Sequence, residues 1–195
     1  MYDRHPRRER SGTADLRWMC EQVDGETLEV GIGRGRSLPF YPPAIQLHGV
    51  DISRVSLAAT ERRAHELGVK ADLREADAAS LPYPDESFDT VVFCFSLCTI
   101  PDDRRAIAEA ARVLRCGGKL VVVEHVRSPR RVVHAVQRLA EPLTLRFQAD
   151  HLTRDPLEYI LAEELEIEFL ERRMLGIVER LVARKPEADE LEEAV

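Results

Sequence analysis

Three glycines at alternate positions, Gly31, Gly33 and Gly35, follow a short apolar segment that ends at Val30. Glycine adopts backbone conformations that other residues avoid, and it leaves neighbouring main-chain N–H groups open to a ligand. A strand that runs directly into such a turn is typical of the first βα unit of an α/β protein. The sequence therefore predicts a parallel sheet with a ligand site at the carboxyl end of its first strand.

A carboxylate follows the next expected strand. Residues 47–50 form a short apolar segment, and Asp51 comes directly after it, twenty residues beyond Gly31. An acidic side chain at this place in an α/β fold accepts hydrogen bonds from the two hydroxyls of a ribose. A glycine-rich turn combined with a ribose acid predicts a cofactor that contains adenosine.

Two residues bear on which adenosine cofactor this is. The dinucleotide fingerprint needs a third glycine three residues after the second, and Arg36 occupies that position. Glu29 places a carboxylate at the mouth of the loop, where it would repel a pyrophosphate and attract a cationic amino acid. These residues favour S-adenosylmethionine over a nicotinamide dinucleotide, and a nicotinamide-dependent oxidoreductase is the less favoured alternative.

Length and composition limit the class of protein. A chain of 195 residues fits one α/β domain. Its net charge of −7 argues against a nucleic-acid partner, because phosphate binding needs a basic surface. Its four cysteines follow no paired framework, and no apolar run reaches 18 residues. We expect a cytoplasmic protein, at most peripheral at a membrane.

The pattern of apolar residues predicts a Rossmann-like, doubly wound sheet of seven strands, mostly parallel with an antiparallel C-terminal hairpin. We expect strands at 26–30, 47–50, 69–74, 88–94, 119–125, 166–174 and 177–183. We expect helices at 14–23, 53–67 (with Ser53 as cap and Gly68 as stop) and 102–115. The domain would span 14–185, between an N-terminal arm at 1–13 and an acidic, disordered tail at 186–195.

Two further motifs carry a family resemblance. Residues 81–89 (LPYPDESFD) and 112–120 (RVLRCGGKL), together with the glycine loop, resemble the class I S-adenosylmethionine-dependent methyltransferases, in particular the quinone-biosynthesis C-methyltransferases. The resemblance covers about residues 26–126. Cys116 departs from it, because the family usually has proline there. The resemblance implies a set of cofactor-binding residues: Glu29, Gly31, Gly33, Gly35, Asp51, Ile52, Asp77, Ala78, Cys94 and Phe95.

A narrower resemblance rests on three short stretches. Residues 97–102 (LCTIPD), 124–126 (EHV) and 152–155 (LTRD) are similar to the methyltransferase-like subgroup that contains the membrane-associated thiol methyltransferases of animals. That subgroup carries an N-terminal hydrophobic anchor, which this sequence lacks. We therefore do not extend the resemblance to membrane residence or to a thiol substrate.

Candidate catalytic residues follow from the chemistry of methyl transfer. The reaction is an in-line displacement, and a general base is needed only when the acceptor arrives protonated. His125 follows the fifth strand at the carboxyl edge of the sheet and is the first candidate base; His151 is the second. The alternative is that His125 only orients the loop after it. Cys94 and Cys98 lie near His125 without a recognised metal-ligand spacing, so we expect no metal.

Residues 127–155 form an insert before the last two strands. Ser128 and Pro129 suit the start of a helix whose apolar positions recur on one face at 132, 133, 136, 139 and 140. One interpretation is a helix that covers the substrate. The other is contact with an anionic membrane, because residues 127–146 carry five arginines and one glutamate.

The sequence therefore predicts a methyltransferase that uses S-adenosylmethionine and releases S-adenosylhomocysteine. We expect a small, apolar or amphiphilic acceptor: a thiol, a quinone or phenol, or a lipid amine. Nucleic acid is not expected, because the proline-rich motif of the amino-methylating DNA enzymes is replaced by residues 95–98 (FSLC). The alternative from outside catalysis is a regulatory module that binds S-adenosylmethionine without transferring its methyl group.

Overall fold

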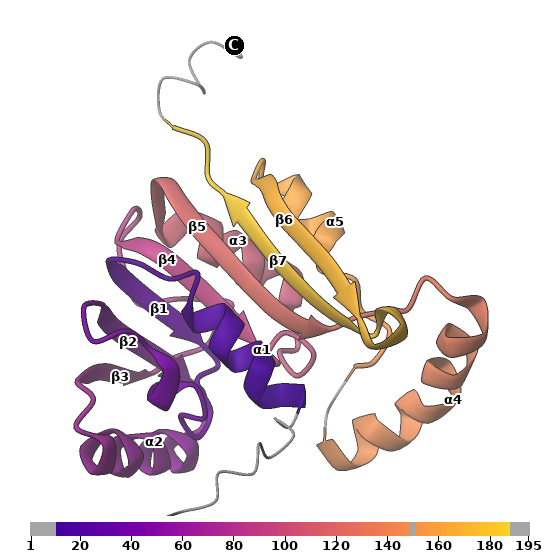
Figure 1. The fold of residues 1–195 in the computed structure, drawn as a ribbon, viewed down its shortest axis with the longest axis horizontal. Coiled ribbons are helices and arrows are strands. Elements are labelled where there is room, and N and C mark those ends of the chain that lie inside the picture. Colours follow the sequence, from indigo (N-terminus) through magenta and orange to yellow (C-terminus); the bar gives the residue numbers. More distant parts are fainter. Residues whose placement is uncertain (1–10, 149–150, 188–195) are drawn as a thin grey trace, which may run out of the picture.

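The computed structural model describes residues 11–148 and 151–187. Its described strands form one seven-stranded sheet in the order β3-β2-β1-β4-β5-β7-β6 (Figure 1). Strands β1 to β5 are parallel, and β7 runs antiparallel between β5 and β6. The strands are β1 (Glu26–Val30), β2 (Gln46–Asp51), β3 (Ala71–Glu75), β4 (Phe88–Cys94), β5 (Leu114–His125), β6 (Glu166–Arg173) and β7 (Val178–Arg184). The predicted fold class is confirmed.

Helices cover both faces of this sheet. The described helices are α1 (Ser11–Cys20), α2 (Arg54–Leu67), α3 (Asp103–Val113), α4 (Arg131–Gln148) and α5 (Leu157–Ala162), with short 3₁₀ turns η1 (Leu38–Phe40) and η2 (Met174–Gly176). Successive residues of the central strands point to opposite faces. Val91 packs in the core with α3 and α5, whereas Val92 packs in the core with α1 and α2. The near-continuous apolar strands are therefore buried on both sides.

The turn between β2 and α2 matches its prediction. The hydroxyl of Ser53 accepts a hydrogen bond from the Ser56 N–H at 3.3 Å, which caps the helix. Gly68 ends the helix with a φ of 67°, a conformation that glycine adopts without strain. This short connection holds the residues after β2 at the carboxyl edge of the sheet.

Several predicted boundaries differ from the structure. Helix α1 begins at Ser11, so residues 11–13 of the predicted arm are helical. Helix α3 ends at Val113 and β5 begins at Leu114, because Leu114 pairs with Phe88 in the sheet. Helix α5 was not predicted. The remainder of the predicted arm (1–10) and most of the predicted tail (188–195) lie outside the described residues.

Helix α4 also differs from its prediction. It begins at Arg131, and the Ser128 hydroxyl accepts a hydrogen bond from the Arg130 N–H just before it. The predicted apolar face exists, and its residues Val132, Val136 and Leu139 are exposed. In the described part of the chain, no helix combines the length and apolar character that crossing a membrane requires.

Candidate functional site

The glycine loop lies where β1 and the segment after β4 approach each other most closely. Gly31 donates a backbone hydrogen bond to Val50 O at 2.8 Å and has a φ of 74°. A Cβ at this position would lie 2.6 Å from the Cβ of Ser96, so a larger residue would push the two segments apart. At Gly33, in contrast, the nearest heavy atom to an added Cβ lies 3.9 Å away. Gly31 therefore serves packing, and Gly33 leaves open space beside the loop.

The Asp51 carboxylate is fixed by two backbone donors. Its Oδ2 accepts from the Gly33 N–H at 2.9 Å, and its Oδ1 accepts from the Ser53 N–H at 2.8 Å. Each carboxylate oxygen can accept more than one hydrogen bond. The side chain is thus oriented by the loop and by the α2 cap while it still has capacity for a ligand.

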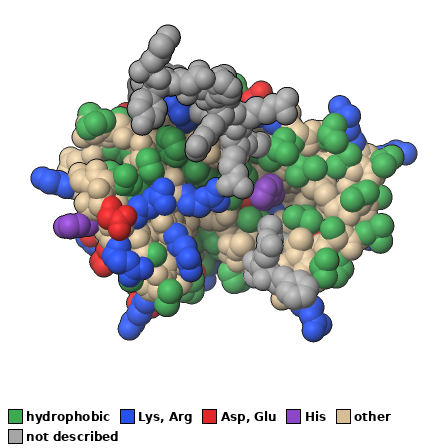
Figure 2. All heavy atoms as spheres, turned by 60° about the horizontal axis from the view of Figure 1, so that its bottom comes forward, with side chains coloured by type: hydrophobic (Ala, Val, Ile, Leu, Met, Phe, Trp, Pro, Cys, Tyr) green, Lys and Arg blue, Asp and Glu red, His purple; other side chains and the backbone are tan. Residues whose placement is uncertain are grey.

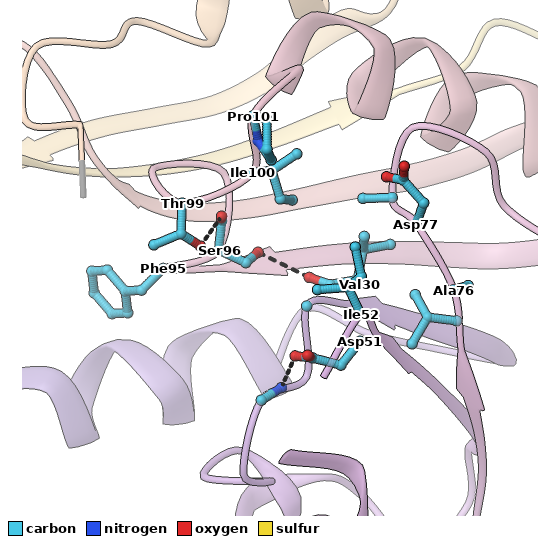
Figure 3. A pocket seen from close by; sticks show the side chains of 14 residues that line it. Val30, Asp51, Ile52, Ala76, Asp77, Phe95, Ser96, Thr99, Ile100 and Pro101 are labelled. Carbon is cyan, nitrogen blue, oxygen red and sulfur yellow. Dashed lines mark hydrogen bonds between the residues drawn. The ribbon is translucent and has the colours of Figure 1, made fainter. Parts of the chain in front are cut away.

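A cavity of about 260 Å³ opens beside this carboxylate (Figure 3). Asp51, Ile52 and Asp77 line one side of it, and the segment from Phe95 to Pro101 lines the other. Ile52 is 72% exposed, which leaves an uncovered apolar side chain at the cavity wall. The cavity brings together seven of the predicted cofactor-binding residues: Gly31, Gly33, Asp51, Ile52, Asp77, Ala78 and Phe95.

A second hollow of about 180 Å³ lies on the other side of the glycine loop. It shares Gly31, Gly33 and Phe95 with the first and adds Glu29, Cys94 and two residues of α1, Gly12 and Leu16. Gly35 belongs to neither lining; a Cβ there would lie 2.7 Å from Leu38 Cδ1, so this glycine allows close packing. The loop therefore borders two hollows of different chemistry.

Glu29 gives the second hollow a buried carboxyl group, and Arg34 and Arg36 also line this hollow. The side chain is only 3% exposed, and its Oε2 accepts hydrogen bonds from Ser37 Oγ at 2.6 Å and Tyr41 Oη at 3.0 Å. Burial raises the pKa of Glu29 to about 7, although both hydrogen bonds act to lower it. The sequence pattern located Glu29 but not its two donors, because they follow in an irregular segment with no recognisable spacing.

His125 lies in a cluster at the end of β5. Its ring centroid is 4.7 Å from that of Phe95, and potential ligand atoms of Cys98, Glu124 and His125 lie within 4.8 Å of one another. These three are a group of described residues that could surround a metal ion, which the sequence did not predict. The Glu124 carboxylate already accepts hydrogen bonds from the backbone of Leu97, Cys98 and His125 and from the Cys98 thiol. We therefore interpret Glu124 as an anchor for the loop after β4.

The second candidate base, His151, adjoins the same loop. Its backbone N–H donates to Cys98 O at 3.0 Å, and its Nδ1 lies 3.7 Å from Glu141 Oε1. Its side chain is partly exposed. Cys98 therefore connects the segments that carry both candidate histidines, and neither histidine lines the cavity or the second hollow.

Arg154 has a role that sequence reasoning missed. Its guanidinium donates to the carbonyl oxygens of Leu97, Ile100 and Pro101, and its Nε lies 3.5 Å from Asp103 Oδ2. These bonds hold the loop that forms one wall of the cavity. Arg154 belongs to the LTRD stretch, but a motif so short does not reveal which distant loop its arginine will reach.

Sequence comparison finds methyltransferases. Residues 28–122 match the family model described as a methyltransferase domain. Phosphatidylethanolamine N-methyltransferase of Cereibacter sphaeroides is 40% identical over 116 residues, which cover 58% of this chain and 57% of that protein. Demethylmenaquinone methyltransferase of Thermus thermophilus is 34% identical over 136 residues, covering 65% and 62%. The chain thus spans about three-fifths of the length of these curated relatives.

Structure comparison gives the same fold over a larger part of the chain. The crystal structure of the YcgJ protein from Bacillus subtilis superposes with a TM-score of 0.72 at 20% identity, covering 90% of this chain and all of that one. At this identity the likeness concerns the fold alone. The evidence for the family comes from the sequence match. This match includes the glycine loop and the acidic residues Glu29 and Asp51. The match over residues 28–122 and these relatives support the class I S-adenosylmethionine-dependent methyltransferase superfamily for this chain.

Proposed function

We propose that this protein transfers the methyl group of S-adenosylmethionine to a small, apolar or amphiphilic acceptor and releases S-adenosylhomocysteine. The observation that carries the proposal is the pair of hollows on either side of the glycine loop, one beside Asp51 and Asp77 and the other beside Glu29. Their chemistry suits the two unlike ends of this cofactor, an adenosine and an amino acid. Bound S-adenosylmethionine supplies a methyl group that its sulfonium has already activated.

The first cavity suits the adenosine end. Asp51 would accept from the ribose hydroxyls, for which its backbone-fixed orientation is appropriate. Asp77 would accept from the adenine amino group, and its other oxygen accepts from the Ala79 N–H at 2.9 Å. Ile52 offers an exposed apolar surface to the flat ring. This arrangement supports the prediction that all three residues bind the cofactor.

The second hollow suits the amino-acid end. Ser37 and Tyr41 both donate to Oε2 of Glu29, so Oε1 is the oxygen that an ammonium group would meet. A buried carboxylate is strongly stabilised by a paired cation, because the surrounding dielectric is low. Glu29 would therefore meet the ammonium group of the cofactor's amino-acid end, in a hollow that Arg34 and Arg36 also line.

The acceptor side is proposed from the cluster around His125 and from the relatives. His125 would accept a proton from a thiol, phenol or ammonium acceptor, with Glu124 and Cys98 fixing its loop. The two relatives are named for phosphatidylethanolamine and demethylmenaquinone. Both are lipid-soluble molecules, which supports an amphiphilic acceptor. A thiol acceptor is supported only by the narrower family resemblance.

The experiment that tests this function is methyl transfer from tritium-labelled S-adenosylmethionine into a small-molecule extract of the source cells. We expect label in the organic phase after partition against water. Label confined to the aqueous phase would support a methyltransferase but contradict an apolar acceptor. Cofactor binding without transfer into any acceptor would contradict the enzyme and favour a regulatory module.

Replacing Asp51 with alanine is expected to weaken S-adenosylmethionine binding by about 1–3 kcal/mol, because buried ribose hydroxyls would lose their acceptor. Isothermal titration calorimetry measures the change. Asp72→Ala is the matched control, since Asp72 is a half-exposed carboxylate one strand away from the cavity. Equal affinity of the Asp51 variant and the wild type would show that the proposed ribose site is wrong.

Replacing His125 with glutamine is expected to lower kcat by about 10²-fold or more without changing cofactor affinity, because a positioned base contributes roughly that factor. His65→Gln on the exposed face of α2 is the control. Full activity of the His125 variant at every pH would show that His125 is not a catalytic base and that alignment of the acceptor with the methyl group accounts for the rate.

A further inference from the structure

Helix α4 is fastened to the body of the protein through one face. Gln137, only 5% exposed, accepts from the Ser128 N–H through Oε1 at 2.9 Å. Its Nε2 donates to the carbonyl oxygens of Val126 and Leu152, both at 2.9 Å. This buried amide fixes which side of the helix faces inward.

The outward side of α4 carries a continuous apolar stripe. Val132, Val136, Leu139 and Leu143 follow one another at intervals of four, three and four residues, which places them in a single row on a helix. These four side chains are between 60% and 82% exposed. Single exposed aliphatic residues are ordinary, but a full row along an 18-residue helix marks an interaction surface.

Positive charge surrounds this stripe. Residues 127–146 contain five arginines and one glutamate, although the whole chain has a net charge of −7. At 100° per residue, Arg131 and Arg138 share one flank of the helix, about 110–130° around the axis from the centre of the stripe. Figure 1 shows α4 standing away from the sheet, and Figure 2 shows hydrophobic side chains, with arginines at their margin, over the lobe on that side.

Charge and apolar surface together decide between the possible occupants: residues 186–195, with five acids, match the charge but offer few apolar side chains to the stripe. Residues 1–10 of the chain contain four arginines against two acids, so their net charge has the same sign as the flank. Two copies of the chain that met stripe to stripe with their helices antiparallel would bring their arginine flanks to the same side. An anionic bilayer satisfies both features, because aliphatic side chains enter the boundary of the acyl chains while arginines reach lipid phosphates.

We propose that α4 docks this protein on an anionic membrane surface and that the acceptor enters the site from the lipid. The second half of this statement rests on the proposed function. Val126 directly follows His125, and Leu152 directly follows His151, so Gln137 ties the docking helix to both segments that carry candidate bases. A helix held on the membrane would thereby hold the acceptor side of the site toward the lipid.

The test is co-sedimentation of the full chain with vesicles of phosphatidylcholine alone or with 30% phosphatidylglycerol. We expect binding that rises strongly with the anionic lipid. Leu139→Ser is expected to reduce the partition coefficient several-fold, because it removes an 82% exposed side chain from the stripe. The double variant Arg131→Gln/Arg138→Gln is expected to reduce it by about 25-fold on anionic vesicles, at about fivefold for each arginine.

Matched controls change the same residue types elsewhere. Leu161→Ser alters an exposed leucine on α5, and Arg62→Gln/Arg63→Gln removes two charges from the exposed face of α2. Equal loss with these controls, equal binding to neutral and anionic vesicles, or no binding to either would overturn the proposal. A dimer in gel filtration that Leu139→Ser dissociates would assign the stripe to a second copy and would also overturn it. Cofactor binding, measured separately, distinguishes these results from a failure of the proposed function.

Discussion

Replacing Asp15 with alanine is expected to lower the free energy of unfolding by about 3 kcal/mol, because the buried Arg180 would lose its nearest carboxylate and keep only that of Glu171 at 3.6 Å. Asp15 Oδ1 accepts from Arg180 Nη2 at 2.6 Å, from Arg180 Nε at 2.9 Å and from Arg173 Nη1 at 3.0 Å. Arg180 is itself only 9% exposed and stacks over the Trp18 ring. Thermal unfolding should show a Tm lower by roughly 10 °C.

The same substitution should also weaken cofactor binding. Asp15 belongs to α1, and Gly12 and Leu16 of this helix line the hollow that contains Glu29. Without the ion pair between Asp15 and Arg180 of β7, helix α1 would hold its side of this hollow less firmly. Glu168→Ala is the control, because its partner Arg184 and Glu168 itself are both more than one-third exposed. Such a pair contributes about 1 kcal/mol or less. Equal destabilisation by the two variants would show that burial does not determine the cost.

The sequence was most informative where structure depends on neighbouring residues. The glycine loop, Asp51 and the Ser53 cap were all located correctly, because each depends on a turn within a few residues of a strand. The hairpin of β6 and β7 was likewise predicted from two adjacent apolar stretches, and its antiparallel pairing is confirmed. Features of this kind depend on residues that are close in the sequence, so the sequence pattern predicts them.

Contacts between distant segments could not be predicted in the same way. Arg154 reaches carbonyl oxygens more than fifty positions away, and Glu124 meets Cys98 only because β4 and β5 are neighbours in the sheet. Periodicity predicted the apolar face of α4 but not its direction. That direction is set by Gln137, a polar residue that the apolar pattern ignores. The candidate cofactor site was therefore more predictable than the acceptor side.

Binding of S-adenosylmethionine is expected to release close to one proton at pH 6 and to become about tenfold tighter between pH 6 and pH 7.5. Burial raises the pKa of Glu29 to about 7, so at pH 6 this carboxyl is mostly protonated. An ammonium group favours the ionised form and must expel the proton on binding. The neighbouring Cys20, Tyr41 and Cys94 stay neutral in this range, because burial raises the pKa of each.

The raised pKa of Glu29 also affects the stability of the folded protein. As pH rises, cofactor binding becomes tighter, whereas the stability of the protein without ligand falls. The folded carboxyl holds its proton more tightly than an unfolded carboxyl, whose pKa is 4.5. Ionisation of Glu29 therefore costs nothing below about pH 4.5 and increases in cost up to pH 7, where it reaches about 3 kcal/mol. The protein without ligand should lose stability as pH rises through this window, and bound cofactor should restore it.

Glu29→Gln separates this mechanism from other causes of pH dependence. Glutamine keeps an oxygen for the Ser37 and Tyr41 donors but cannot ionise. Cofactor binding by the variant should therefore no longer weaken at acid pH (the acid limb of the pH profile) and should no longer release a proton. At pH 7.5 it should be weaker than in the wild type by about 2–3 kcal/mol. Calorimetry in two buffers of different ionisation enthalpy measures the proton count. An alkaline limb should persist in both proteins, because the ligand's own amino group loses its proton near pH 8.

Glu124→Gln is the matched control, since burial raises the pKa of Glu124 to about 7 as well and this carboxyl lies in the cluster with His125. It should leave the acid limb of cofactor binding in place. If Glu29→Gln retained that limb, or if only Glu124→Gln removed it, Glu29 would not be the residue that meets the ammonium group. The amino-acid end would then bind elsewhere. Glu29 would serve only to accept the hydrogen bonds of Ser37 and Tyr41.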